Sequence, residues 1–389
     1  MTKLENLIAQ LCPEGVEFKS VGELCERVFA GGTPSTSRKD FYDGEIPWLR
    51  SGEVNFNKIS STERKITEAG LQGSSAKMIR PKSVLLAMTG ATVARSAVNM
   101  IELSANQSVC AMETNEGIIN YKFLYYYLSH NYVRIKNMGQ GALTSLNVST
   151  IKSLQIPVPP LEVQEEIVRI LDKFTSLEAE LEAELEARKK QYEHYRNQLL
   201  TFNTSPQGVR WTTLGEILKY QQPTKYIVKS KEFNNSFTTP VLTAGKTFIL
   251  GKTNEISGIF PASKENPVII FDDFTTSNHW VDFLFKIKSS AMKILQPNTD
   301  DLSFRFVYYM MQTVKFDVGA EHSRQWISKY SKIKIPLPPL EKQREIVEIL
   351  DKFEALTSSI STGLPAEITA RRKQYEYYRA KLLDFKPRA

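Results

Sequence analysis

Residues 156–174 have the sequence IPVPPLEVQEEIVRILDKF, and residues 335–353 repeat it as IPLPPLEKQREIVEILDKF. Fifteen of these nineteen positions are identical, at an offset of 179 residues. A second match pairs ARKKQYEHYRNQLLTF at 187–202 with ARRKQYEYYRAKLLDF at 370–385, where eleven of sixteen positions agree at an offset of 183. An internal repeat decides the architecture, because each copy predicts the same unit of structure.

The repeated segments predict two long helices. Each opens with a Pro-x-Pro-Pro run, which suits an extended entry rather than a helix interior. Apolar and aromatic residues then recur at spacings of three, four or seven, which is the stripe of a coiled coil. The first helix should run for about 40 residues, or about 60 Å. The second copy contains four extra residues that include Gly363 and Pro365, and they predict a kink or a break.

The segments between the helices differ almost completely, so the sequence predicts two divergent globular modules. Two short segments still match between them, 13–23 with 206–216 and 121–126 with 304–309. Apolar runs predict buried strands at 83–88 and 267–271, and aromatic faces predict helices at 121–136 and 302–314. We therefore expect mixed α/β modules and the following division of the chain: 1–155, first module; 156–205, first helical spacer; 206–334, second module; 335–389, second helical region.

The composition is that of an ordinary globular protein. The chain has 389 residues, of which 41% are hydrophobic and 24% charged, which argues against disorder and against membrane spanning. Its first residues lack the apolar core of a signal peptide. The three cysteines, Cys12, Cys25 and Cys110, show no CxxC spacing and favour a reducing compartment. We expect a cytoplasmic protein without a zinc site.

The net charge of +7 is unevenly distributed along the chain. Lysine and arginine outnumber acids by 16 to 13 in residues 13–155 and by 17 to 11 in residues 206–334. In residues 156–205 the acids prevail, by 10 to 6. A positive field favours polyanions, nucleic acid above all. The modules are therefore the candidate DNA-binding parts, and the acidic helix is a spacer and a partner surface.

No catalytic motif is present. The GKT at 245–247 has Pro240 where a phosphate-binding loop needs glycine, and a proline offers no N–H to a phosphate. Glu-x-Lys, a fragment of metal-dependent nuclease sites, occurs at Glu17 and Glu63 and is too short to be informative. Asp272-Asp273 lacks a third acid at a useful distance. The sequence predicts no catalytic residue and no metal ligand.

A duplicated α/β module that alternates with near-identical long helices resembles the specificity subunit of type I restriction–modification enzymes. The resemblance covers essentially the whole chain. It rests on both copies of the Ile-Pro-x-Pro-Pro-Leu-Glu to Leu-Asp-Lys-Phe segment and of Arg-Lys-Gln-Tyr or Lys-Lys-Gln-Tyr. Within the modules, Gly31-Gly-Thr-Pro-Ser35, Gly44-Glu-Ile-Pro-Trp48, the segment 240–248 and Phe271-Asp-Asp-Phe-Thr-Thr276 are similar to that family's target recognition domains.

The resemblance implies a non-catalytic DNA-recognition subunit with a pseudo-two-fold internal repeat. Two target recognition domains would each recognise one half of a bipartite DNA site, and the helices would form an antiparallel coiled coil. Two methyltransferase subunits would dock on those helices, and restriction subunits would join them. S-adenosylmethionine, ATP and magnesium would belong to these partners.

Candidate DNA contacts are polar residues of the modules, because phosphate contacts position a protein on DNA and base contacts specify the sequence. In the first module they are Thr33, Ser35, Arg38, Lys77, Arg95, Asn106 and Gln107. In the second they are Gln222, Lys225, Lys246, Thr247, Thr275, Thr276, Lys288, Ser289 and Arg324. Candidate partner contacts on the helices are Leu177, Leu181, Leu185, Tyr192, Tyr195, Tyr375 and Tyr378.

Two other functions remain open at the level of sequence. A coiled-coil scaffold that joins two protein-binding modules would show the same repeat but no salt-sensitive binding to duplex DNA. A solitary endonuclease is disfavoured by the missing motifs.

Overall fold

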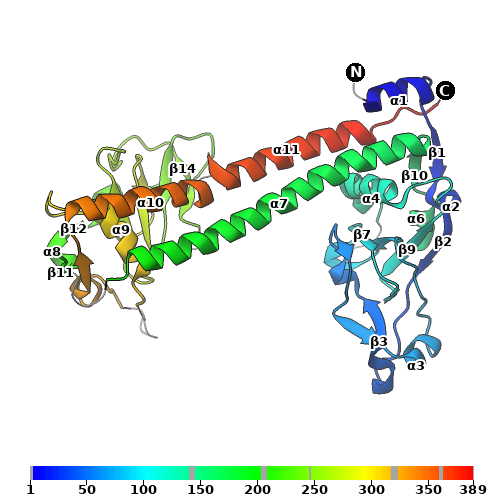
Figure 1. Cartoon of the computed structure of the whole chain (residues 1–389), viewed down its shortest axis with the longest axis horizontal. Helices are drawn as coiled ribbons and strands as arrows, with labels where there is room; N and C mark the ends of the chain where they lie inside the picture. The colour runs from blue at the N-terminus through cyan, green and yellow to red at the C-terminus, as the bar shows by residue number, and fades with distance from the viewer. Residues whose placement is uncertain are drawn as a thin grey trace. The chain divides into compact units, whose positions relative to one another are not determined.

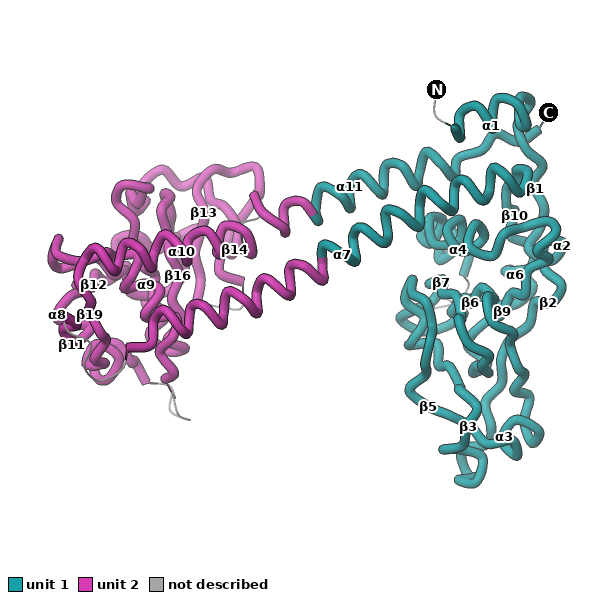
Figure 2. Tube along the Cα trace, in the orientation of Figure 1, with its two compact units in different colours: residues 1–181, 368–389 teal, residues 182–367 magenta. Residues whose placement is uncertain are grey.

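The computed structural model describes residues 3–139, 145–202, 208–244, 247–316, 323–358 and 362–388. The chain divides into two compact units, residues 1–181 with 368–389 and residues 182–367 (Figure 2). Each unit contains one globular module and part of the helical segments, and each is described here by itself. In the described residues no helix is both long and apolar enough to cross a membrane.

The module of unit 1 is built on two sheets (Figure 1). Its strands are β1 (Glu17–Ser20), β2 (Cys25–Ala30), β3 (Tyr42–Leu49), β4 (Lys58–Ile59), β5 (Arg64–Ile66), β6 (Val84–Ala87), β7 (Ser96–Asn99), β8 (Ser104–Ala105), β9 (Val109–Thr114) and β10 (Gln155–Val158). Its helices are α1 (Lys3–Leu11), α2 (Val21–Leu24), α3 (Glu68–Gln72), α4 (Tyr121–His130), α5 (Tyr132–Asn137) and α6 (Val148–Lys152). One sheet has the order β2-β9-β6-β7-β4 and the other β5-β3-β8, while β1 pairs with β10.

The module of unit 2 repeats this plan. Its strands are β11 (Arg210–Thr213), β12 (Leu218–Gln221), β13 (Thr239–Leu242), β14 (Ile249–Thr253), β15 (Val268–Asp272), β16 (Asn278–Val281), β17 (Lys286–Ile287), β18 (Met292–Pro297) and β19 (Lys334–Leu337). Its helices are α8 (Leu214–Ile217) and α9 (Phe304–Thr313). The sheet orders are β12-β18-β15-β16 and β14-β13-β17, and β11 pairs with β19.

The two modules therefore share one topology although their sequences differ. The strands β2-β9-β6-β7 are joined by antiparallel pairings, as are β12-β18-β15-β16. In the smaller sheets, β3 is antiparallel to β5 and parallel to β8, and β13 is antiparallel to β14 and parallel to β17. Both modules are mixed α/β folds, as the sequence predicts.

The short matching segments at 13–23 and 206–216 correspond to the place where the chain enters each module. The entering strand pairs antiparallel with the leaving strand, β1 with β10 and β11 with β19. A capping box then starts a one-turn helix, formed by Ser20 with Glu23 in unit 1 and by Thr213 with Glu216 in unit 2. In such a box the cap and the third residue satisfy one another's free backbone N–H groups.

The predicted strands at 83–88 and 267–271 are confirmed as β6 and β15. The predicted helix at 302–314 is α9, whereas the one at 121–136 is divided into α4 and α5 at Asn131. The tyrosines of α4 pack in the core, where Tyr126 and Tyr127 are buried.

The helical segments follow the predicted pattern. Helix α7 (Leu161–Leu199) has 39 residues, whereas the second copy is divided into α10 (Leu340–Ser358) and α11 (Gly363–Leu383). The break lies at the predicted insertion, where Gly363 adopts a φ of +76° that favours glycine.

Aromatic contacts join the helices within each unit. In unit 1, Phe174 of α7 contacts Tyr375 and Tyr378 of α11, with ring centroids 6.1 and 5.7 Å apart. Further along α7, Glu178 pairs with Arg372 at 2.5 Å, so the contact partners on α11 run in the opposite direction. These two helices are antiparallel. In unit 2, Phe353 of α10 contacts the rings of Tyr192 and Tyr195 of α7 at 6.2 and 5.6 Å.

Candidate nucleic-acid interface

Three loops of unit 1 share one edge of the five-stranded sheet. The end of β2, Ala30, lies opposite Cys110 near the start of β9, and Ala87 at the end of β6 lies opposite Val109. The backbone N–H of Ala87 donates to the carbonyl of Arg95, just before β7. In an antiparallel sheet such strand ends lie side by side. The loops that follow β2, precede β9 and join β6 to β7 are therefore neighbours, and we call this the recognition edge of unit 1.

Six of the seven candidates in the first module lie in these loops. The hydroxyl of Thr33 donates to the side chain of Gln107, which brings two residues 74 positions apart together. The Asn106 side chain accepts a hydrogen bond from the N–H of Ser108 at 3.2 Å. Arg95 donates from Nη1 to Oδ1 of Asn55 at 2.8 Å.

Ser35 and Arg38 lie in the loop after β2 and make local contacts, whereas Lys77 lies outside the three loops and close to β2. The Lys77 ammonium is 5.4 Å from the ring centroid of Phe29, the residue before the end of β2. Ser35 hydrogen-bonds Ser37 at 2.8 Å. The guanidinium of Arg38 donates twice to the carboxylate of Asp40, at 2.8 and 2.6 Å. These hydrogen bonds lower the pKa of Asp40, so the charge of Arg38 is matched by an adjacent anion.

The equivalent loops of unit 2 share an edge in the same way. Gln221 at the end of β12 lies opposite Ile294 of β18, and Asp272 at the end of β15 lies opposite Met292 at the start of β18. The loop that follows β12, the turn between β15 and β16 and the loop before β18 are therefore neighbours. They form the recognition edge of unit 2 and contain Gln222, Lys225, Thr275, Thr276, Lys288 and Ser289.

Arg324 is attached to this edge through Asp273. The N–H of Gln325 donates to the Asp273 carbonyl at 2.8 Å, and the N–H of Trp326 donates to the Asp273 carboxylate at 2.7 Å. Both contacts hold the segment that carries Arg324, whose side chain is exposed.

Thr247 lies between the antiparallel strands β13 and β14, not between a strand and a helix. The N–H of Thr243 donates to the carbonyl of Phe248 at 2.9 Å, between β13 and β14. A phosphate-binding loop would lead from a strand into a helix. Lys246 lies outside the described residues.

The acidic pair at the end of β15 has a structural role. Asp273 is buried and pairs with the buried ammonium of Lys293 at 3.4 Å, while Asp272 accepts from the N–H of Phe274 at 3.0 Å and the hydroxyl of Thr275 at 2.5 Å. In the described part of the chain, no group of three or more histidine, cysteine or acidic side chains is placed to hold a metal ion.

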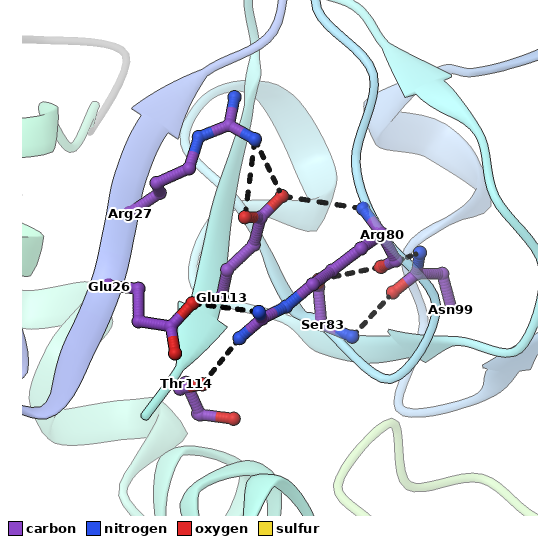
Figure 3. Close-up of polar contacts among 7 residues, drawn as sticks. All are labelled: Glu26, Arg27, Arg80, Ser83, Asn99, Glu113 and Thr114. Carbon is purple, nitrogen blue, oxygen red and sulfur yellow. Dashed lines mark hydrogen bonds and ion pairs between the residues drawn. The ribbon is translucent and has the colours of Figure 1, made fainter. Parts of the chain in front are cut away.

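The opposite edge of the unit 1 sheet is closed by a polar network (Figure 3). The buried carboxylate of Glu113 accepts from Nη1 of Arg27 at 3.2 and 3.3 Å and from the N–H of Arg80 at 3.3 Å. The Arg80 guanidinium donates to Glu26 at 2.7 Å and to the carbonyl of Thr114 at 2.5 Å. Both arginines are thus paired with carboxylates inside the module.

The cations at the recognition edges differ from Arg27 and Arg80 in their ion pairing. None of the ion pairs among the described residues involves Lys77, Arg95, Lys225, Lys288 or Arg324. The ammonium groups of Lys77 and Lys288 instead lie over the rings of Phe29 and Phe233, at 5.4 and 5.2 Å. These edges therefore keep cations that are available to an anionic ligand.

Sequence reasoning missed the side chains that support these cations, which are Asn55, Phe29 and Phe233. Asn55 and Arg95 are 40 positions apart, and Lys288 is even further from Phe233. No local pattern joins such residues, because the tertiary fold brings together segments that are far apart in the sequence.

The candidate partner residues lie on the helices. Leu177, Leu181, Leu185, Tyr192 and Tyr375 are half-buried. Tyr195 and Tyr378, at equivalent positions of the repeat, keep 39% and 38% of their surface exposed.

Comparison with known proteins places these features in a family. A family model described as type I restriction modification DNA specificity domain matches residues 13–187 and, a second time, residues 206–370. Over 187 residues the chain is 55% identical to the specificity subunit of the type I restriction enzyme EcoR124I/EcoR124II of Escherichia coli. That alignment covers 46% of the chain and 45% of the relative, so the chain matches about half the length of this protein.

Two further matches extend over most of the chain. The specificity subunit of the type I restriction enzyme EcoprrI of Escherichia coli is 29% identical over 370 residues, which are 85% of the chain and 86% of that protein. The crystal structure of a type I restriction–modification system S subunit from M. genitalium has the same fold, with a TM-score of 0.61 and 16% identity over 95% of the chain and 96% of that protein.

Proposed function

Because the chain belongs to the family of type I restriction–modification specificity subunits, the non-catalytic DNA-recognition subunits of these enzymes, we propose that each of its modules binds one half of a bipartite duplex target. One observation carries this proposal. Two modules of the same topology present different polar loops at the same edge of their main sheets. Two modules that share a fold but carry different contact residues are suited to bind two different half-sites.

The charge of the recognition edges supports binding to DNA rather than to protein. Cations without a carboxylate partner can neutralise phosphates and release the counterions that surround the duplex. Side chains such as Gln107, Thr275 and Arg324 carry the donors and acceptors that base edges require. The phosphate contacts would fix the position of each module, and the base contacts would determine the sequence.

The helices supply the docking surface for the partners in this proposal. Tyr195 and Tyr378 occupy equivalent positions and are both partly exposed, so two copies of one methyltransferase subunit would meet the same side chain. Restriction subunits would then join this core. S-adenosylmethionine, ATP and magnesium would be bound by these partners, which carry out methylation and cleavage.

The test is to purify the chain with its methyltransferase subunit, supply DNA and S-adenosylmethionine, and map the methylated adenines. We expect one asymmetric motif made of two half-sites and a spacer of fixed length. Binding to duplex DNA should weaken linearly in a plot of log affinity against log salt concentration. Methylation that does not depend on this chain, or duplex binding that salt does not affect, would favour a scaffold of protein-binding modules.

A further inference from the structure

Each near-identical helical segment carries a buried glutamine that contacts its module. The side-chain oxygen of Gln164 accepts a hydrogen bond from the N–H of Asn120 at 2.8 Å, and that of Gln343 accepts from the N–H of Ser303 at 2.9 Å. Each amide also donates to a carbonyl of the preceding proline run at 2.7 Å. Asn120 and Ser303 are the N-caps of α4 and α9, so each glutamine binds the start of a module helix.

An aspartate of the same segment binds that module helix a second time. In unit 1, the carboxylate of Asp172 accepts from the ammonium of Lys122 at 2.5 Å and from the hydroxyl of Tyr126 at 2.7 Å. Lys122 and Tyr126 lie one turn apart on α4, and the two side chains therefore reach the same carboxylate. Burial and the neighbouring carboxylate raise the pKa of Tyr126, so its hydroxyl remains a donor.

Unit 2 makes the same contacts with a different cation. Asp351 accepts from Nε of Arg305 at 2.8 Å and from the hydroxyl of Tyr309 at 2.5 Å. The Arg305 guanidinium also donates to Glu354 and lies 4.6 Å from the ring centroid of Trp280. The arginine of unit 2 thus replaces the lysine of unit 1 without changing the contact to the helix.

The two attachments of each unit form what we call a clamp. The clamp of unit 1 consists of Gln164, Asp172, Lys122 and Tyr126, and that of unit 2 consists of Gln343, Asp351, Arg305 and Tyr309. The glutamine and the aspartate are eight residues apart, or about 12 Å along the helix. Apolar residues of the same segments, such as Ile167 in unit 1 and Ile346 in unit 2, pack into the cores of the modules. The two polar attachments lie on this packed interface and add directional contacts that define the orientation of the module on its helix.

We propose that these clamps are positioning devices for DNA recognition: they hold each module at one orientation on its helix and thereby determine the spacing at which the two half-sites are recognised. This inference rests on the proposed function. A module is compatible with the clamp when its helix supplies a free N–H at the cap, a cation two residues later and a tyrosine six residues later. The base-contacting loops are separate from these groups, so a weakened clamp should change the spacing and leave the recognised bases unchanged.

The experiment measures methylation of duplexes whose half-sites are separated by the wild-type spacer or by one base pair more or less. The purified complex with the methyltransferase subunit is used throughout. We expect Lys122→Met to reduce the preference for the wild-type spacer about tenfold, the factor expected from one lost hydrogen bond to a charged group. The Lys122→Arg variant should keep the wild-type preference, because unit 2 uses an arginine at this position. Lys173→Met, a change of an exposed neighbour on α7, is the matched control and should have no effect.

The outcomes separate this inference from the proposed function. A wild-type complex without a bipartite motif overturns both. A bipartite wild type whose Lys122→Met variant loses methylation equally at all spacers, or keeps the original preference, overturns the clamp alone. Should Lys122→Met fail to fold, Tyr126→Phe removes a single hydroxyl and carries the same expectation of a relaxed spacer.

Discussion

Lys225 and Lys264 are exposed lysines of one module that lie at opposite edges of its four-stranded sheet. Lys225 follows β12 at the recognition edge, whereas Lys264 precedes β15. We expect Lys225→Ala to weaken binding to every DNA sequence alike and to lower the slope of log affinity against log salt by about one, because one phosphate contact is lost. Lys264→Ala should change neither quantity. Fluorescence anisotropy of the complex with the methyltransferase subunit, between low and moderate salt, makes the comparison. If both variants have the same effect, the recognition edge is not part of the DNA interface.

Glu166 makes the stability of unit 1 depend on pH in the acidic range. Its buried carboxylate accepts two hydrogen bonds from Arg169, at 2.9 and 2.6 Å, and pairs with Lys3 of α1 at 3.1 Å. The contact with Arg169 is the main cause that lowers the pKa of Glu166 to about 2, and burial opposes it. A carboxyl group with a lowered folded-state pKa stabilises the fold at pH values above its unfolded pKa of about 4.5. This contribution is lost as the pH falls from there towards 2.

The Glu166→Gln variant tests this response. At pH 6 it should unfold at a lower urea concentration than the wild type, and the difference should shrink as the pH is lowered through 4.5 to 3.5. Comparing the two proteins at each pH removes the effect of the other carboxylates, which titrate in both. A difference that stays constant over this range would show that the charge of Glu166 contributes nothing.

Some residue-level features are visible in the sequence and others are not. The pairing of Arg38 with Asp40 is local, so an arginine and an aspartate two positions apart in the sequence already indicate it. The structural role of Asp273 is not visible, because its partners Lys293 and Trp326 come from other parts of the chain. A pair of adjacent aspartates has the same appearance in a metal site and in a buried ion pair, and only tertiary contacts distinguish the two.

At the level of elements, local periodicity explains what the sequence predicts well. Helix α7 follows from its apolar stripe, and the break before α11 follows from Gly363 and Pro365. The buried strand β6 is apolar throughout and β15 is apolar up to Phe271, so both are recognisable as well. By contrast, β8 and β17 are two-residue strands whose parallel pairings with β3 and β13 depend on segments far away in sequence. The common topology of the modules was therefore not predictable from either module alone.

Helix α7 also contains a repeat that tests whether it determines the distance between half-sites. Residues 177–188 consist of LEAE, LEAE and LEAR, all inside this one helix. An additional LEAE unit after Glu184 lengthens the helix by about 6 Å and turns it about 40° beyond a full turn. B-DNA rises about 3.4 Å per base pair and turns once in about 10.5 base pairs. The insertion is thus equivalent to one to two base pairs of rise and about one base pair of twist. Because both modules bind one duplex, we expect the preferred spacer to become about one base pair longer, with both half-sites unchanged.

Methylation mapping of the insertion variant makes this measurement. An insertion of the same four residues after Ser230, in a connecting segment of the second module, is the control for a general effect of a longer chain and should leave the spacer length as it is. If the preferred spacer is unchanged by the additional LEAE unit, the helix does not determine the distance.

At the level of the whole molecule, the two compact units and the repeated topology indicate that each module is an independent part. The chain enters the second module through β11 and leaves it through β19, and these strands are paired. The described entry and exit of the module, Arg210–Thr213 and Lys334–Leu337, therefore lie side by side, and an exchange of residues 206–334 leaves α7 and residues 335–389 intact.

Exchange of residues 206–334 for the corresponding module of another family member should replace one half-site and preserve the other. The first module keeps its own hydrophobic clusters and its own recognition edge, so the bases it contacts do not change. The donor should supply the cation and the tyrosine that contact Asp351, because the clamp of unit 2 would otherwise lose its partners. Methylation mapping of the hybrid complex is the measurement, with the wild-type and donor motifs as references. A hybrid in which both half-sites change would mean that the modules recognise DNA jointly, and the duplicated topology would then reflect folding alone.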